Sequence, residues 1–168
     1  MQTENYTTAT KMKFIINVFV VIACLVHMAL SESTPFKKCS IGKPPQDFVI
    51  QGCTEEPCIL VRNRMASANI SFIVDKYTTV LTPQVEVSMP EVRGHIWKIS
   101  QPENNGCVML SRNETCPLKA GTKSTLTYHA FVKLPHRKAK KLVNLRFSLL
   151  DQDNEVLTCC QIAVKITR

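Results

Sequence analysis

Apolar and polar residues alternate with a period of two along most of the chain after residue 32. This alternation is typical of β-strands with one buried face, whereas a surface helix would repeat every three to four residues. Four runs show it most clearly, at 66–74, 83–90, 125–135 and 142–150. Their apolar faces consist of Ala68, Ile70, Phe72 and Val74; Val85, Val87 and Met89; Leu126, Tyr128, Ala130, Val132 and Leu134; and Val143, Leu145, Phe147 and Leu149.

Shorter segments extend the same pattern. Residues 47–52, 58–62 and 94–100 are further strand candidates, and a last strand is expected from about 156 to 167. Prolines at 83, 90, 102, 117 and 135 are expected between strands, because proline has no backbone N–H and a hydrogen-bonded ladder must end there. Eight or so short strands, each with one apolar face, predict an all-β sandwich of two antiparallel sheets. No helix is expected after the N-terminal segment.

The N-terminal segment has the layout of a secretory signal peptide. Two lysines, Lys11 and Lys13, precede an apolar run at 14–30, and small residues follow at Ala29 and Ser31. This predicts a signal peptide over 1–31, cleaved after Ser31, with Met12 as an alternative start. A single domain, 32–168, then remains. The protein is expected to be secreted, with lysosomal or endosomal delivery as a variant; an N-terminal membrane anchor is the competing interpretation.

Loss of Cys24 with the signal peptide leaves seven cysteines. In an oxidising compartment they are expected to form disulfides rather than a metal site. Cys53 and Cys58 enclose only TEEP, and Cys107 and Cys116 enclose VMLSRNET, so both pairs are natural local disulfides.

The adjacent residues Cys159 and Cys160 are expected to point to opposite faces of the last strand. Cys160 alternates in step with the apolar residues of that strand and is expected to be an unpaired, buried thiol. Cys159 lies on the other face, where the remaining Cys39 can reach it. A Cys39–Cys159 bridge closes a very long loop and contributes about 4–5 kcal/mol in the chain-entropy view. A different or partly intermolecular pairing stays open.

Two sequons lie in the predicted mature domain, at Asn69 and Asn113, and both are expected to carry glycans on the surface. Lys and Arg outnumber Asp and Glu by 21 to 13, a net charge of +8. Such a balance favours acidic surfaces, including anionic lipids and glycans. Nucleic acid is not an expected partner for a secreted glycoprotein.

No enzyme pattern emerges. The histidines after the signal peptide lie in separate segments, and no G-x-S-x-G, H-E-x-x-H or paired-carboxylate motif is present. We therefore expect neither catalysis nor a cofactor, and no metal site.

Several motifs together resemble a known family. These are the two short cysteine loops, the second ending in Cys-Pro; an early cysteine with a late partner; and the strings ANISF, KLP and LTCCQIAVKI. The chain resembles ML lipid-recognition domains of the Niemann–Pick type C2 kind over nearly all of 36–168. The resemblance implies an immunoglobulin-like sandwich whose interior is a hydrophobic cavity for a lipid, and it pairs Cys39 with Cys159.

The resemblance also implies a function. The protein is expected to hold a sterol, a fatty acid or a similar hydrophobic ligand between its sheets, as a monomer. The alternatives are an innate-immune adaptor that recognises microbial glycolipid for a receptor, and an adhesion-type sandwich with a packed core. The residues expected to line the cavity are Phe72, Val87, Ile96, Trp97, Tyr128, Phe147, Cys160 and Ile162, each of which can also be plain core.

One stretch departs from the sterol carriers. Where they have a valine after KLP and then an aromatic residue, this chain reads HRKAKK. The change puts cholesterol specificity in doubt and favours an anionic headgroup, a fatty-acid carboxylate or docking on an anionic membrane surface. A lipid-accepting receptor is an alternative partner. A solvated basic loop is the competing interpretation. The residues expected to make this contact are His136, Arg137, Lys138, Lys140 and Lys141.

Overall fold

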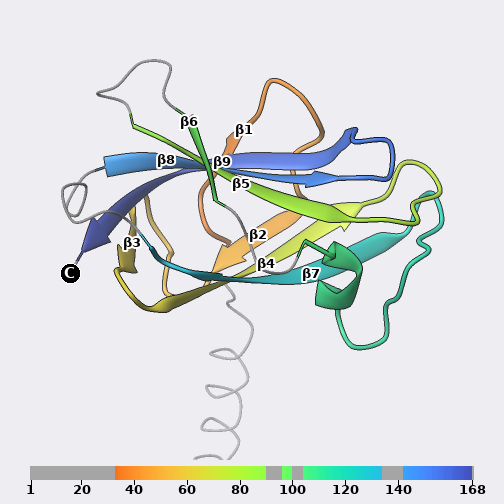
Figure 1. Ribbon diagram of the computed structural model, residues 1–168, viewed down its shortest axis with the longest axis horizontal. Helices are drawn as coiled ribbons and strands as arrows, with labels where there is room; N and C mark the ends of the chain where they lie inside the picture. The colour runs from red at the N-terminus through yellow and green to blue at the C-terminus, as the bar shows by residue number, and fades with distance from the viewer. Residues whose placement is uncertain (1–32, 90–95, 100–103, 134–141, 168) are drawn as a thin grey trace, which may run out of the picture. The chain divides into compact units, whose positions relative to one another are not determined.

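The structure is a computed structural model of the 168-residue chain, and it describes residues 33–89, 96–99, 104–133 and 142–167 (Figure 1). Within these ranges the chain forms nine strands and one short 3-10 helix. They are β1 (Lys37–Lys38), β2 (Asp47–Ile50), β3 (Cys58–Val61), β4 (Met65–Ile73), β5 (Thr82–Ser88), β6 (Ile96–Ile99), η1 (Gly106–Met109), β7 (Lys123–Phe131), β8 (Leu142–Leu150) and β9 (Val156–Thr167).

The strands form two layers, which Figure 1 shows one above the other. The larger sheet has the order β1-β9-β8-β5-β6, with β3 also paired to β9, and the smaller has the order β2-β4-β7. The predicted all-β sandwich is confirmed. One pairing differs from the prediction, because β3 runs parallel to β9 while the other strand pairs are antiparallel. No helix in the described ranges is long and apolar enough to cross a membrane.

The core follows from the alternation in the sequence. Phe72 on β4, Leu126 on β7, and Val143 on β8 point into the space between the sheets and are at most 1% exposed. Outward positions such as Asn69 and His129 are exposed. Burial of these apolar faces, at about 25 cal/mol per Å² removed from water, is the main force that holds the layers together.

The structure forms three disulfides: Cys53–Cys58, Cys107–Cys116 and Cys39–Cys159. The long-range bond explains how an outward cysteine is fully buried. The segment around Cys39 lies across β9, and the backbone N–H of Cys159 donates to the carbonyl oxygen of Lys43 at 2.8 Å. The N-terminal segment is thereby fastened to the last strand.

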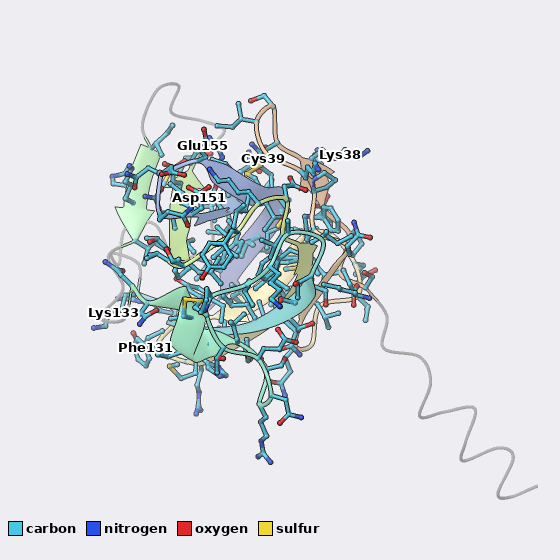
Figure 2. All side chains as sticks on the ribbon, turned by 90° about the vertical axis from the view of Figure 1, so that its right-hand side faces the viewer. Lys38, Cys39, Phe131, Lys133, Asp151 and Glu155 are labelled. Atoms are coloured by element: carbon cyan, nitrogen blue, oxygen red, sulfur yellow. A yellow bond between two sulfur atoms is a disulfide. The ribbon has the colours of Figure 1, made fainter. Side chains whose placement is uncertain are left out.

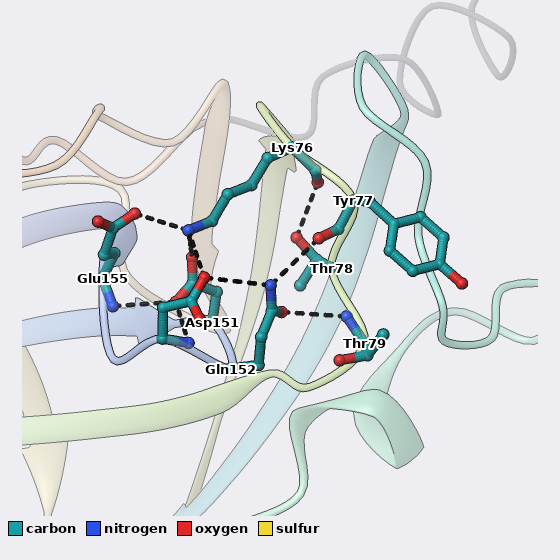
Figure 3. A network of polar contacts seen from close by, with 8 residues as sticks. Lys76, Tyr77, Thr78, Thr79, Asp151, Gln152 and Glu155 are labelled. Atoms are coloured by element: carbon teal, nitrogen blue, oxygen red, sulfur yellow. Dashed lines mark hydrogen bonds and ion pairs between the residues drawn. The ribbon is translucent and has the colours of Figure 1, made fainter.

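A polar network ties the turn between β8 and β9 to the loop after β4 (Figure 3). The carboxylate of Asp151 is fully buried and accepts from the backbone N–H groups of Asp153 at 2.8 Å and Glu155 at 2.9 Å. The Lys76 ammonium lies 2.7 Å from Asp151, 2.8 Å from Asp153 and 2.6 Å from Glu155. The three carboxylates therefore surround a cation that the chain itself supplies.

This environment shifts two pKa values. Burial acts to raise the pKa of Asp151, but hydrogen bonds from Lys76 and from the backbone of Glu155 and Asp153 hold it below its ordinary value. The hydrogen bond to Asp151, followed by those to Asp153 and Glu155, holds the pKa of Lys76 well above its usual range. Because the Asp151 pKa is lowered on folding, its stabilising contribution is present above about pH 4 and is lost as the pH falls through the native pKa.

We expect Lys76→Met to lower the free energy of unfolding at pH 7, because Asp151 then stays buried without a countercharge. The difference from the wild type should shrink as the pH falls toward 3, because the unpaired buried carboxyl of the variant takes up a proton and then needs no countercharge, whereas the wild-type carboxyl, whose pKa is lowered, takes up its proton only at lower pH. Urea unfolding across pH 3–7 measures it. The control is Lys43→Met, which removes an exposed ion pair of 2.6 Å with Asp75 and should have little effect. A Lys76→Met loss that is the same at every pH would contradict this account.

Candidate functional site

An apolar cavity of about 100 Å³ lies between the two sheets. Both sheets and strand β3 contribute to its wall, and nearly all of the contributing side chains are aliphatic or aromatic. The lining consists of Phe48, Ile50, Leu60, Ala66, Ser67, Ala68, Val85, Ile99, Tyr128, Ala130, Phe131, Val132, Lys133, Leu145, Phe147, Cys160, Ile162 and Ile166.

Small side chains leave this space unfilled. On β4 and β7, Ala66 lies opposite Ala130, and Ala68 lies opposite Tyr128. On β8 and β9, Phe147 lies opposite Cys160. Where alanine and cysteine stand at inward positions instead of leucine or phenylalanine, the facing sheet cannot supply the missing volume. The cavity is therefore a direct result of the residue sizes at these positions.

Two aromatic rings connect the sheets at the cavity. Tyr128 of β7 and Phe147 of β8 meet edge to face, with their ring centroids 5.4 Å apart and their planes at 68°. This geometry is the favourable one for aromatic pairs and is worth about 0.5–1.5 kcal/mol beyond area burial. It keeps the two layers in contact beside the cavity.

The cavity reaches the surface at the end of β7. Phe131 and Lys133 are the two lining residues in the described ranges that are exposed. The Lys133 ammonium lies 5.5 Å from the centroid of the Phe131 ring, a cation–π contact. Figure 2 shows both residues at the same edge of the molecule. A positive charge thus stands beside the opening of an apolar space.

Cys160 is the one free cysteine in the described part of the chain. It is 1% exposed, and its side chain lines the cavity. In the sheet, its backbone lies opposite that of Lys38 on the neighbouring strand β1. Burial raises the pKa of its thiol to about 12. The thiol is therefore protonated at neutral pH and chemically inert.

The structure brings four of the eight predicted lining residues to the cavity wall: Tyr128, Phe147, Cys160 and Ile162. Phe72 points inward but is four residues beyond Ala68 on β4, about 13 Å further along the sandwich, where it packs in the solid core. Contact of any of these residues with a ligand stays a prediction.

The other three residues lie on or near the edge strand β6. Val87 and Trp97 lie opposite each other, one inward position beyond the lining residues Val85 and Ile99. Ile96 is 59% exposed, because the alternation of β6 turns Trp97 and Ile99 inward and Ile96 outward. The prediction of Ile96 at the cavity therefore disagrees with its outward position.

The remaining predicted sites lie on the surface or outside the described residues. The sequon residues Asn69 and Asn113 are exposed. The basic residues predicted to contact a headgroup fall outside the described ranges: His136, Arg137, Lys138, Lys140 and Lys141.

Sequence reasoning missed several lining residues. For Val85 and Leu145 the signal was present, since each occupies the same apolar face as a residue that was chosen. The alanines at 66, 68 and 130 carry no such signal, because a small apolar residue on an inner face equally fits a packed core. In the sequence, Lys133 contributes only to the KLP tripeptide that supports the family resemblance. Its position beside the opening depends on where β7 ends.

The fold places the chain in a class of proteins, the immunoglobulin-like β-sandwiches of the ML type, and an apolar cavity lies between its two sheets. A family model described as the ML domain matches residues 33–166. The chain belongs to the ML domain family, whose members are non-enzymatic lipid-binding proteins.

The individual proteins that resemble this chain share little sequence identity with it. The mite group 2 allergen Tyr p 2 of Tyrophagus putrescentiae is 26% identical over 142 residues, which is 84% of this chain and 92% of the allergen. A Niemann–Pick type C2 protein from the Japanese carpenter ant has a similar structure, with a TM-score of 0.66, 18% identity, and coverage of 79% of this chain and 99% of that chain. Chicken MD-1, solved in complex with lipid IVa, gives a TM-score of 0.49 at 15% identity, over 77% of this chain and 86% of that one.

The burial of Cys160 makes a prediction about its reactivity. At pH 8 a thiol with a pKa of about 12 holds so little thiolate that a disulfide reagent should react at least about 10³-fold more slowly than with an ordinary cysteine. In a protein that lacks residues 1–31 and therefore Cys24, we expect Ellman's reagent to label no thiol quickly in the native state and one thiol per chain in guanidinium chloride, with the Cys160→Ala variant giving none. Rapid labelling of the native protein, or a peptide map with Cys160 in a disulfide, would contradict the assignment.

Proposed function

We propose that this protein is a secreted lipid carrier that holds the apolar part of an amphiphile between its two sheets. The observation that carries the proposal is the apolar cavity that reaches the surface beside Lys133. The driving force is the removal of ligand surface from water, about 0.8 kcal/mol for each buried methylene group. Association entropy offsets part of this gain, so several buried methylenes are needed for useful affinity.

The size of the cavity bears on the kind of ligand. About 100 Å³ is well below the roughly 300–1,000 Å³ typical of small-molecule sites. A slender acyl chain requires less separation of the two sheets than a rigid sterol ring system does. We therefore favour a fatty acid or another single-chain amphiphile over a sterol.

The charge at the opening bears on the headgroup. A tail buried among Ala68, Ala130 and Phe147 leaves its headgroup near the end of β7, where Lys133 stands. The chain continues from Lys133 into the basic stretch 134–141, so further cations follow directly in the sequence. A carboxylate or a phosphate is the complementary headgroup. The same charges suit a docking contact with an anionic membrane surface.

The cellular setting supports a carrier outside the cytosol. Three disulfides fit an oxidising compartment and are consistent with secretion. The signal peptide at 1–31 and the single mature domain 32–168 are part of the proposal. The adaptor alternative rests on the family resemblance alone.

Filling the cavity should abolish binding. Ala68→Phe places a ring in the cavity, and we expect at least a tenfold loss of affinity for a fluorescent fatty acid, measured by titration. Ala163→Phe is the matched control, because Ala163 is half-buried on the opposite face of β9 from the lining residues. Both variants must keep the wild-type near-ultraviolet circular dichroism. Unchanged binding by a folded Ala68→Phe protein would contradict the proposed site.

The headgroup contact has a separate test. Lys133→Ala should weaken binding of a long-chain fatty acid about three- to tenfold while leaving the corresponding long-chain alcohol unaffected, because only the acid offers a charge to the ammonium. Lys123→Ala, at the other end of β7, is the control and should change neither affinity. Equal losses for the acid and the alcohol would show that Lys133 acts by packing alone, contrary to the proposal.

A further inference from the structure

A second hollow lies on the outer side of the smaller sheet. It is an open groove of about 550 Å³, formed by residues 108–112, at the end of η1 and directly after it, and by Thr127 and His129 of β7. It faces away from the inner, lipid-cavity side of β7, since His129 and Tyr128 alternate along that strand. Nothing in the lipid-binding proposal uses it. Its volume falls within the range of small-molecule sites.

The lining of the groove combines apolar and hydrogen-bonding groups. Val108 is 64% exposed, so it offers an apolar surface to the solvent. Arg112 contributes five N–H donors, and Thr127 and His129 add a hydroxyl and an imidazole. A pyranose ring has the same mixed character, with C–H faces and a rim of hydroxyl groups. A carbohydrate therefore suits this lining better than a purely apolar ligand or an ion.

Both sequons of the mature domain adjoin residues that line this groove. Asn69 of β4 lies directly opposite Thr127 of β7, and Thr127 is a lining residue. Asn113 follows the lining residue Arg112 in the sequence. Two sequons that are distant in the sequence thus each adjoin a residue that lines the same groove.

The Asn69 side chain is already held in place at the groove. The Thr127 hydroxyl donates to the Asn69 carbonyl oxygen Oδ1 at 3.0 Å. N-glycosylation modifies the amide nitrogen Nδ2, so this hydrogen bond and a glycan are compatible. The bond restricts the amide on a rigid strand, whereas Asn113 belongs to the loop closed by the Cys107–Cys116 disulfide.

We propose that the groove seats the inner N-acetylglucosamine residues of the chain's own glycan on Asn69. The attachment point is one strand spacing, about 4.8 Å, from the Thr127 wall. A short tether gives an effective concentration in the millimolar range, so even a weak intrinsic affinity for the sugar keeps the groove occupied. The proposal depends on glycosylation of Asn69 and is independent of the lipid-binding function.

The test is the release of the glycan from the folded protein. The full chain is secreted from insect or mammalian cells, and release at each sequon by peptide-N-glycosidase F is followed by mass spectrometry of the glycopeptides. In the native protein we expect release at Asn69 to be at least tenfold slower than in the denatured protein. Val108→Asp and, independently, Arg112→Glu should each accelerate native release at Asn69 at least threefold.

Two controls separate a seated glycan from a merely inaccessible asparagine. Ile41→Asp, an equally drastic change at a residue 54% exposed and outside the groove, should leave the Asn69 rate unchanged. Asn113→Gln removes the other glycan and should also leave it unchanged. The proposal is overturned if Asn69 carries no glycan, if its native release is as fast as in the denatured protein, or if neither groove variant accelerates it.

Discussion

Strand β9 is the element on which the rest of the structure depends. It is twelve residues long, pairs with β8 along one edge, and pairs with both β1 and β3 along the other. Its Cys159 carries the disulfide to Cys39, and its inward face contributes Cys160, Ile162 and Ile166 to the cavity. The same strand therefore joins the two ends of the domain and forms part of the cavity wall. Strict alternation along β9 allows both roles, because successive side chains point to opposite faces of the sheet.

The cavity lowers stability, and other interactions offset that cost. An empty apolar space of about 100 Å³ costs about 2 kcal/mol, by analogy with cavities made by mutation in other cores. The Cys39–Cys159 bond closes a loop with a sequence separation of 120 and restores about 4–5 kcal/mol through the unfolded state. The Lys76 network fastens the turn between β8 and β9 far more locally. An unfilled interior is thus compatible with a stable fold, and a ligand that fills the space stabilises the native state further.

The sequence predicted the sandwich because alternation, prolines and cysteine spacing all indicated the same architecture. It identified Tyr128, Phe147, Cys160 and Ile162 because each occupies the apolar, inward-facing side of a predicted strand. It did not reveal where the core is solid and where it is hollow. Phe72 and Ala68 share one face of β4, and only the facing residues decide which of them borders a space. The parallel pairing of β3 and the place of Lys133 beside the opening depend on tertiary arrangement. The outward position of Ile96 does not, because adjacent residues on one strand, such as Ile96 and Trp97, cannot both face the core.

The central claim is that the space between the sheets exists to hold a lipid. Native mass spectrometry of the secreted protein, purified without detergent and then incubated with an equimolar long-chain fatty acid, tests it most directly. The account predicts one additional mass per chain equal to that of a single lipid, lost on denaturation. A protein that shows only its own mass, both as purified and after incubation with fatty acid or sterol, would contradict the account.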